Sequence, residues 1–311
     1  MSNKKTNLLA KLALLVVAIL WGSSLTVVKE ASHELNPNFI LAIRFSLSAI
    51  LLAIIFIKKL KGLTKDDIKH GLIIGIFLFL AYTSQTIGVT FADPGRSGFL
   101  SASYCVIVPF LSWIIFKKKP DKFNIAAAIL CVSGIFFISM SKSTSSSQND
   151  LAWLGDLLAL LSGFLFASHI VAVSALAKGK DPIVMTILQF VMAAILSWIV
   201  AIFIEDNSSI SISRTSLFEL LYLSIMCTAV ALLLQNVGQK YTDPSTASLI
   251  LGFESVFGIL IPVLLGIETL TVYSVIGFVL VFLAIIVSET KLSFITGKDY
   301  SDSSDYNNKD E

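Results

Sequence analysis

The sequence contains little charge. Only 14% of its 311 residues are Asp, Glu, Lys or Arg, whereas 55% are hydrophobic, and the mean hydropathy is +0.84. Soluble domains carry about 25% charged residues, so this chain lacks the polar surface that a water-soluble fold needs. The composition excludes a soluble globular protein and indicates that the chain lies in a lipid bilayer.

Residue types that carry chemistry are also scarce. The chain has three His and three Cys, and Cys105, Cys131 and Cys227 have neither an even count nor the spacing of a metal site. We therefore expect no disulfide, metal or other cofactor. The Walker A and H-E-x-x-H patterns do not occur, which argues against an ATP-driven pump and a zinc peptidase. Lys and Arg are spread over loops, so nucleic acid is not an expected partner.

Long apolar runs are abundant. They recur at about the 20 residues that a transmembrane helix needs, and they lack the strict alternation of a β-barrel. An all-α polytopic membrane protein is therefore predicted. The first run resembles a signal peptide, but no A-x-A-type cleavage site follows it, so we expect it to be retained. The ten predicted spans are residues 9–29, 37–57, 70–90, 97–116, 123–141, 153–177, 182–204, 215–237, 245–267 and 271–289.

The basic residues predict how these spans are oriented. With the N-terminus inside, 18 of the 23 Lys and Arg residues fall in inner segments or adjoining helix ends, and four fall in outer segments. Cytoplasmic loops carry such an excess in membrane proteins. Both termini are therefore expected in the cytoplasm, with the chain a multi-pass protein of the cytoplasmic membrane, taken to be that of a bacterium.

One stretch of the sequence occurs twice. "QTIGVTFADPGRSGFL" (85–100) and "QNVGQKYTDPSTASLI" (235–250) share Gln, Gly, Asp and Pro at a constant offset of 150 residues. Each copy belongs to a set of five spans, and five is an odd number. The second set must therefore enter the membrane from the opposite side, which gives the inverted repeats that are usual in secondary transporters.

A second correspondence supports the repeat. At an offset of 145 residues Trp21 meets Phe166 and Arg44 meets Gln189. The offset also relates the prolines that begin spans two and seven. The predicted parts are a first repeat (1–141), a Ser-rich external connector (142–150), a second repeat (151–290) and a disordered acidic cytoplasmic tail (291–311).

Four motifs occur in a characteristic order: "WGSSLTVVKE", "NPNFILAIRF", "SGFLSASYCVIVPFLSWIIFKKKP" and "ESVFGILIPVLLGIETLT". Through them the chain resembles the EamA-type transporters of the drug/metabolite transporter superfamily over about residues 10–290. The resemblance implies ten helices in two inverted five-helix repeats, with a central cavity lined by helices 1–4 and 6–9. It also implies small-metabolite transport, often export of amino acids or related compounds. The family commonly has Pro after the Glu of helix nine, whereas Ser255 follows Glu254 here.

Two charged residues, Arg44 and Glu254, lie deep inside predicted spans. By the helical rise Glu254 is roughly 13 Å from the inner boundary and Arg44 roughly 10 Å from the outer one. A charge at such depth costs about 2.5–3.5 kcal/mol, so both should face the protein interior or a watery cavity. We predict that Glu254 lines the cavity, where it binds a substrate amine, carries a coupling proton or holds Arg44. Arg44 suits a carboxylate. The alternatives are a structural pair, or Arg44 snorkelling to the outer surface.

Neutral polar and aromatic residues complete the predicted site. His169 is a candidate proton carrier, although a lone His is more often a packing residue. Buried amides are explained equally well by ligand contacts and by hydrogen bonds between helices. Aromatic and polar residues three apart on one helix could form a wall for an amphipathic solute, although each aromatic alone is more often packing. Besides Arg44 and Glu254, the predicted substrate-binding residues are Trp21, Ser24, Tyr82, Gln85, Tyr104, Gln189, Gln235 and Asn236.

The predicted function is secondary transport of a small metabolite, an amino acid or related zwitterion, by alternating access, with export favoured. The alternative is a membrane-embedded enzyme acting on a lipid or peptide. A dense cluster of His, Asp and Glu at the inner surface would favour that alternative and does not occur, so we expect no enzyme. The expected partners are a small solute and the bilayer. The sequence leaves the direction of transport, the coupling ion and formation of a homodimer open.

Overall fold

The computed structural model describes residues 2–117, 119–140, 151–208, 210–266 and 271–290, and this part of the chain is helical without strands. The predicted connector (142–150) and tail (291–311) lie outside the described residues. The helices are α1 (Ser2–Ala31), α2 (Pro37–Ile55), α3 (Ile57–Leu60), α4 (Lys65–Phe91), α5 (Pro94–Ser101), α6 (Tyr104–Phe116), α7 (Lys122–Ser139), α8 (Ala152–Leu176), α9 (Pro182–Phe203), α10 (Arg214–Ser224), the π-helix η1 (Ile225–Val230), α11 (Ala231–Lys240), α12 (Pro244–Leu251), α13 (Glu254–Leu264) and α14 (Val272–Thr290).

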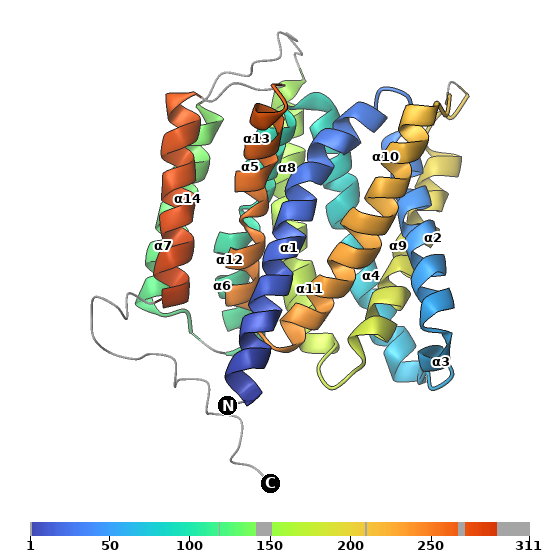
Figure 1. Cartoon of the computed structure of the whole chain (residues 1–311), viewed down its shortest axis with the longest axis horizontal. Helices are drawn as coiled ribbons and strands as arrows, with labels where there is room; N and C mark the ends of the chain where they lie inside the picture. The colour runs from blue at the N-terminus through green and yellow to red at the C-terminus, as the bar shows by residue number, and fades with distance from the viewer. Residues whose placement is uncertain (1, 118, 141–150, 209, 267–270, 291–311) are drawn as a thin grey trace.

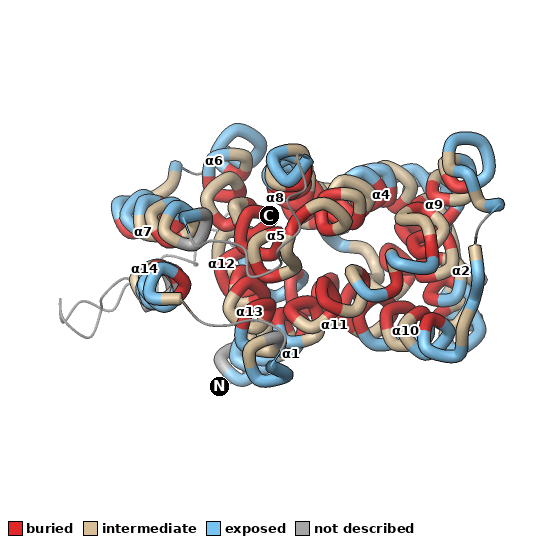
Figure 2. The backbone as a smooth tube through the Cα atoms, turned by 90° about the horizontal axis from the view of Figure 1, so that it is seen from above, coloured by how far each residue is buried: buried red, intermediate tan, exposed pale blue. Residues whose placement is uncertain are grey.

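The helices stand side by side in one bundle (Figure 1). Eight segments are long and apolar enough to cross a membrane, and three of them join consecutive helices, such as α5 with α6. The apolar parts of α7 and α14 are shorter, and these two helices pack together at one side of the bundle (Figures 1 and 2). Each predicted span coincides with a helical segment. Ten crossings, inverted topology and cytoplasmic termini remain predictions.

The outer surface of the bundle is apolar. Ile114, Ile129 and Phe203 are 60–79% exposed, and exposed residues lie on the outward faces of the helices while buried ones face inward (Figure 2). Inside, Phe45 of α2 and Phe190 of α9 pack with ring centroids 6.0 Å apart. An apolar exterior of this extent would be costly in water and suits contact with lipid tails.

Two spans are broken at equivalent places. The span of α5 and α6 is interrupted at residues 102–103, and the span of α12 and α13 at residues 252–253. At both breaks the backbone bonds shorten to i−3, as from Cys105 N to Ala102 O (3.0 Å) and from Ser255 N to Gly252 O (3.1 Å). The two breaks are 150 residues apart, which is the offset of the sequence repeat. Each break therefore places the start of a new helix inside the bundle.

Another span contains a π-helix. Residues Ile225–Val230 widen the helix between α10 and α11, and the Thr228 hydroxyl donates to the carbonyl of Leu223, five residues earlier (2.7 Å). The corresponding span of the first repeat, α4, is one continuous α-helix. Short π-segments in α-helices often occur at functional sites.

Ion pairs join the two halves of the chain at both ends of the bundle. At the end where α1 begins, Lys180 Nζ contacts Asp66 (2.6 Å) and Asp67 (2.8 Å). At the opposite end Arg96 binds Asp156 through Nε (2.8 Å) and a terminal nitrogen (2.6 Å). In this conformation both ends are thus held by contacts between the halves.

Candidate functional site

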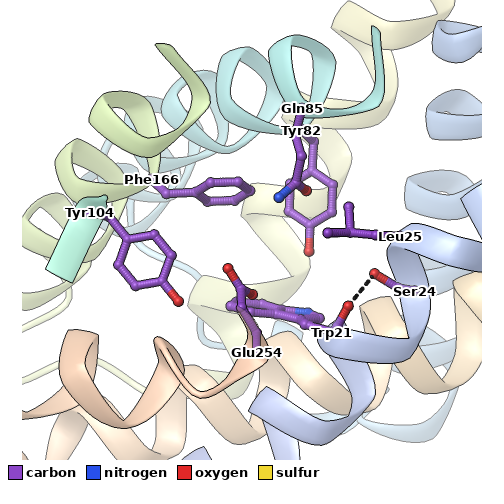
Figure 3. A pocket seen from close by; sticks show the side chains of 8 residues that line it. All are labelled: Trp21, Ser24, Leu25, Tyr82, Gln85, Tyr104, Phe166 and Glu254. Carbon is purple, nitrogen blue, oxygen red and sulfur yellow. Dashed lines mark hydrogen bonds between the residues drawn. The ribbon is translucent and has the colours of Figure 1, made fainter. Parts of the chain in front are cut away.

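A small pocket lies between the helices of the bundle (Figure 3). The space inside it that the centre of a water molecule can occupy is about 10 Å³, close to the minimum that holds one water. Five helices from both halves contribute to its walls: α1, α4, α6, α8 and α13. The residues that line it are Trp21, Ser24, Leu25, Tyr82, Gln85, Tyr104, Phe166 and Glu254.

The single charged residue of this lining is Glu254, the first residue of α13. Its side chain is 4% exposed, and Oε1 has no hydrogen-bond partner. The Tyr104 hydroxyl points toward it (Figure 3), but no hydrogen bond of normal geometry joins the two groups. A buried carboxylate is costly unless it is paired. Glu254 therefore offers a strong free acceptor for a cation or a proton.

A glycine brings Glu254 close to the aromatic wall on α1. A Cβ on Gly22 would lie 2.5 Å from Phe257 Cβ and 2.9 Å from the carbonyl oxygen of Glu254. Those distances are shorter than atoms tolerate, so α1 and α13 can approach this closely only with glycine at position 22. The next residue along the chain, Ser23, is outside the pocket, whereas the preceding Trp21 lines it.

Aromatic rings form most of the remaining wall. Phe166 is at their centre: its ring centroid is 5.3 Å from that of Tyr82, 6.3 Å from Trp21 and 6.3 Å from Tyr104. The rings meet edge-on or tilted, which is the favoured arrangement of aromatic pairs. Faces and edges of such rings can hold an organic cation as well as apolar groups.

Two neutral polar residues line the pocket near these rings. The Ser24 hydroxyl donates to the carbonyl of Trp21 (2.9 Å), which leaves its lone pairs free to accept. Gln85 is 8% exposed, and its amide points into the pocket (Figure 3). A carboxamide both donates and accepts hydrogen bonds. The pocket therefore combines one negative charge, aromatic walls and neutral hydrogen-bonding groups.

Arg44 lies outside this lining. It is 1% exposed, its Nε donates to the Thr228 hydroxyl (3.1 Å), and its guanidinium lies over the Tyr82 ring, 5.2 Å from the centroid. Among the described residues no ion pair joins Arg44 to Glu254, and Tyr82 is the shared neighbour that contacts Arg44 and lines the pocket with Glu254. The predicted pairing of the two charges with each other is therefore not formed in this conformation.

His169 and two of the predicted amides, Gln189 and Asn236, form a separate buried network. His169 Nε2 and Gln189 Oε1 are 2.8 Å apart, Gln189 Nε2 donates to Asn236 Oδ1 (3.4 Å), and Asn236 Nδ2 donates to the Thr186 hydroxyl (2.8 Å). None of these four lines the pocket. Gln235, the residue before Asn236, is also buried, and its Oε1 has no hydrogen-bond partner among the described residues. Hydrogen bonds between α8, α9 and α11 account for most of this group.

Some residues at the site were not predicted. Leu25 and Phe166 line the pocket but are apolar, and apolar residues inside a span give no signal by themselves. Phe166 could have been found, because the repeat offset pairs it with Trp21. Thr228 and Cys227 of the π-helix hold Arg44 and Trp21 (3.0 Å from Trp21 Nε1 to Cys227 O), and the sequence pattern contains no mark of a π-turn.

Comparisons with known proteins agree with this architecture. The EamA-like transporter family matches residues 8–140 and 153–290. An uncharacterized transporter of Archaeoglobus fulgidus is 32% identical over 90% of this chain and 85% of its own. The uncharacterized transporter YoaV of Bacillus subtilis is 22% identical over 87% of this chain and 93% of its own. One crystal structure aligns with 90% of this chain and 96% of its own at a TM-score of 0.71, and its 17% identity limits that likeness to the fold.

Apolar helices packed around a small central pocket, in a chain whose relatives are transporters, define a membrane transporter. The chain belongs to the EamA-like transporter family, within the drug/metabolite transporter superfamily. In the described part of the chain no group of three or more His, Cys, Asp and Glu side chains could hold a metal ion.

Proposed function

We propose that the protein is a secondary transporter that moves a small amine-bearing solute, such as an amino acid or related zwitterion, across the cytoplasmic membrane by alternating access, with export favoured. The observation that carries the proposal is the Glu254 carboxylate, which is buried, faces the pocket and has an unpaired oxygen. No positive side chain lines the pocket with it. The ammonium group of a solute would supply the missing charge.

The aromatic walls support the same chemistry. Trp21, Tyr82, Tyr104 and Phe166 surround the position that such an ammonium group would take beside Glu254 (Figure 3). A cation over an aromatic face gains about 0.5–2 kcal/mol, more when water is excluded. The apolar part of the solute would pack against the remaining ring surface, as in most small-molecule sites.

The carboxylate of an amino acid would meet neutral groups in this pocket. Gln85 and the Tyr104 hydroxyl are available as donors, whereas Arg44 is outside the lining. A neutral donor binds a carboxylate less strongly than a guanidinium does. We therefore expect the amine to be the essential group of the solute, with the carboxylate tolerated and contributing less.

Alternating access is supported by the size of the pocket and by the broken helices. With room for about one water, the pocket can admit a solute only when its walls move apart. The breaks at residues 102–103 and 252–253 lie beside Tyr104 and Glu254 and give two spans a point at which to bend. Discontinuous helices at a central site are common in secondary transporters.

Coupling to protons would follow from the same carboxylate. A proton on Glu254 removes the charge that attracts an amine, so the two cations compete for one group and can be exchanged across the membrane. His169 was the other candidate, but its Nε2 is bonded to Gln189 away from the pocket. We assign coupling to Glu254.

The test uses three solutes with one side chain: phenethylamine, phenylalanine and 3-phenylpropionate. Each is added to the purified protein, and thermal unfolding is followed, since a ligand that binds only the folded state raises stability by RT ln(1 + [L]/Kd). The amine and the amino acid should raise the unfolding temperature, and the acid should not. A leucine set (isoamylamine, leucine, 4-methylpentanoate) covers smaller side chains. Stabilisation by the acids alone would contradict an amine-selective pocket.

Glu254→Gln is the decisive variant, with Tyr104→Phe as the matched change at the equivalent position. Removing the charge should weaken amine binding about a hundredfold or more, whereas removing the hydroxyl should change it less than tenfold. In proteoliposomes, flux without product formation should depend on pH in the wild type and in His169→Gln, and should lose that dependence in Glu254→Gln. Unchanged binding and pH dependence in Glu254→Gln would refute the proposal.

A further inference from the structure

We propose that Arg44 and Thr228 are positioning residues, which hold the aromatic walls of the pocket in place from outside it. Arg44 supports the ring of Tyr82, and Thr228, in the π-helix η1, holds Arg44. This inference rests on the proposed function for its binding readout, and it assigns Arg44 a role other than the predicted contact with the solute.

The contacts of Arg44 point to Tyr82. Its guanidinium is 5.2 Å from the Tyr82 centroid, one of its terminal nitrogens has no hydrogen-bond partner, and Nε donates to the Thr228 hydroxyl (3.1 Å). A buried charge without a carboxylate is costly, and the electron-rich face of a tyrosine compensates for part of that cost. The position of the guanidinium and the position of the ring are therefore coupled.

Thr228 has no freedom to bond in another way. Its hydroxyl donates its one proton to the carbonyl of Leu223 (2.7 Å), so it can only accept from Arg44. The bond to Leu223 spans five residues, which is the spacing of the π-turn itself. The turn thus fixes the direction of the lone pair that receives Arg44.

The same turn holds the opposite wall. The carbonyl of Cys227, the residue before Thr228, accepts from Trp21 Nε1 (3.0 Å), and the Cys227 thiol donates to the carbonyl of Leu20 (3.3 Å). Two consecutive residues of η1 therefore hold Trp21 directly and Tyr82 through Arg44. A shift of the π-turn would move both rings together, which makes η1 the common frame of the two walls.

The first experiment replaces Thr228 with Val, which keeps the shape and removes the hydroxyl, and with Ser, which keeps the hydroxyl. Thr228→Val should weaken phenethylamine binding about tenfold, and Thr228→Ser less than twofold. A double-mutant cycle then tests the route through the ring. Arg44→Gln should weaken phenethylamine and phenylalanine by the same factor, and should have no further effect in a Tyr82→Leu background.

Three outcomes would overturn the inference. If Arg44→Gln weakens phenylalanine but not phenethylamine, Arg44 binds the solute's carboxylate directly. If its effect persists in the Tyr82→Leu background, the ring does not transmit it. Equal binding by Thr228→Val and the wild type would also contradict a role for the π-turn.

A readout without solute separates this inference from the proposed function. With Trp113, Trp153 and Trp198 replaced by Phe, the fluorescence reports on Trp21 alone. Thr228→Val should shift its emission and expose it to acrylamide, and Thr228→Ser should not. If no amine binds the wild type and this difference is still seen, the proposed function fails while the positioning role stands. If amines bind through Glu254 and neither readout responds to Thr228→Val, the positioning role fails alone.

Discussion

At the pocket, both halves of the chain have a span that is broken at the same place, but the side chain that follows the break differs. Tyr104 and Glu254 are 150 residues apart, and each is the first residue after the break in its span. One position carries a neutral phenol and the other a carboxylate. The comparison shows that the shared break places a side chain in the pocket, whereas the residue type decides which chemistry it brings.

The equivalent positions on α1 and α8 show the same relation. At the offset of 145, Trp21 and Phe166 both line the pocket and contact each other. The next residues, Gly22 and Ala167, differ by one methyl group. The extra space at Gly22 lets α13 approach α1. An aromatic wall is thus common to both halves, and the close contact that places Glu254 belongs to one.

Arg44 and Gln189 are the third equivalent pair, and they differ in how many of their polar atoms have hydrogen-bond partners. Gln189 has hydrogen bonds to His169 and Asn236. Arg44 has Thr228 and a ring face, with one terminal nitrogen unpaired. Well-paired amides are typical of structural contacts between helices, and poorly paired buried charges are typical of functional sites. We therefore expect Gln189 to affect stability and Arg44 to affect binding.

The largest effect should come from making the two halves alike at Gly22. Gly22→Ala introduces a methyl group 2.5 Å from Phe257 Cβ, so α1 and α13 must separate, which should cost about 3 kcal/mol. Thermal unfolding measures this loss, and phenethylamine binding should fall with it because Glu254 moves.

The matched control for this change lies on the facing helix. A Cβ on Gly258 would have its nearest neighbour at 3.7 Å, which is an ordinary contact. Gly258→Ala should therefore be tolerated, with unfolding and binding close to those of the wild type. Equal losses in both variants would mean that the approach of α1 to α13 is not set at Gly22.

The helical spans could be predicted from the sequence because apolar length and charge placement are properties of the chain itself. Six of the residues predicted to bind solute do line one pocket: Trp21, Ser24, Tyr82, Gln85, Tyr104 and Glu254. Two arguments predict them: the cost of exposing a charged or polar group to lipid for Glu254 and Gln85, and aromatic and polar residues three apart on one helix face for the others. Whether they bind solute remains a prediction.

The cost argument has a limit, because it could not separate Arg44, Gln189, Gln235 and Asn236 from the pocket. The cost of exposure requires a polar residue to be buried, but several buried environments satisfy it equally. Depth along a helix does not specify which neighbour the side chain meets. The π-turn adds to this limit, because it widens one helix in the span that carries Gln235 and Asn236, and the sequence pattern contains no mark of it.

A middle-sized effect is expected from Gln189→Leu. The change leaves His169 Nε2 and Asn236 Oδ1 without the partners that Gln189 provides, which should cost about 1–2 kcal/mol of stability. Phenethylamine affinity should stay within about twofold of the wild type, since none of the three residues lines the pocket. Arg44→Gln should instead lower phenethylamine affinity more than stability. If Gln189→Leu also lowers the affinity, Gln189 and Arg44 do not differ in role as proposed.

The smallest effects should come from the ends of α2 and α9, where carboxylates hold a helix N-terminus in both halves. Glu205 receives hydrogen bonds from the backbone N–H groups of Asn38 (2.8 Å) and Phe39 (3.1 Å) on α2. Asp181 receives one from Ile183 N (2.9 Å) on its own helix and pairs with Lys59, near the surface. Glu205→Gln should therefore cost about 1 kcal/mol, and Asp181→Asn, which keeps the cap, about 0.5 kcal/mol or less.

The pH dependence of stability should show whether the effect of Asp181→Asn comes from the charge of Asp181. Burial acts to raise the pKa of Asp181, but hydrogen bonds from Lys59 and Ile183 outweigh it and lower the pKa below its ordinary value. A lowered folded-state pKa stabilises the protein above the unfolded value, about pH 4, and this contribution is lost as the pH falls through the folded value. The stability difference between wild type and Asp181→Asn should therefore be constant from pH 7 to 5 and shrink below that. A difference that persists into acid, where Asp181 is protonated, would show that the charge of Asp181 is not the source of the stability difference.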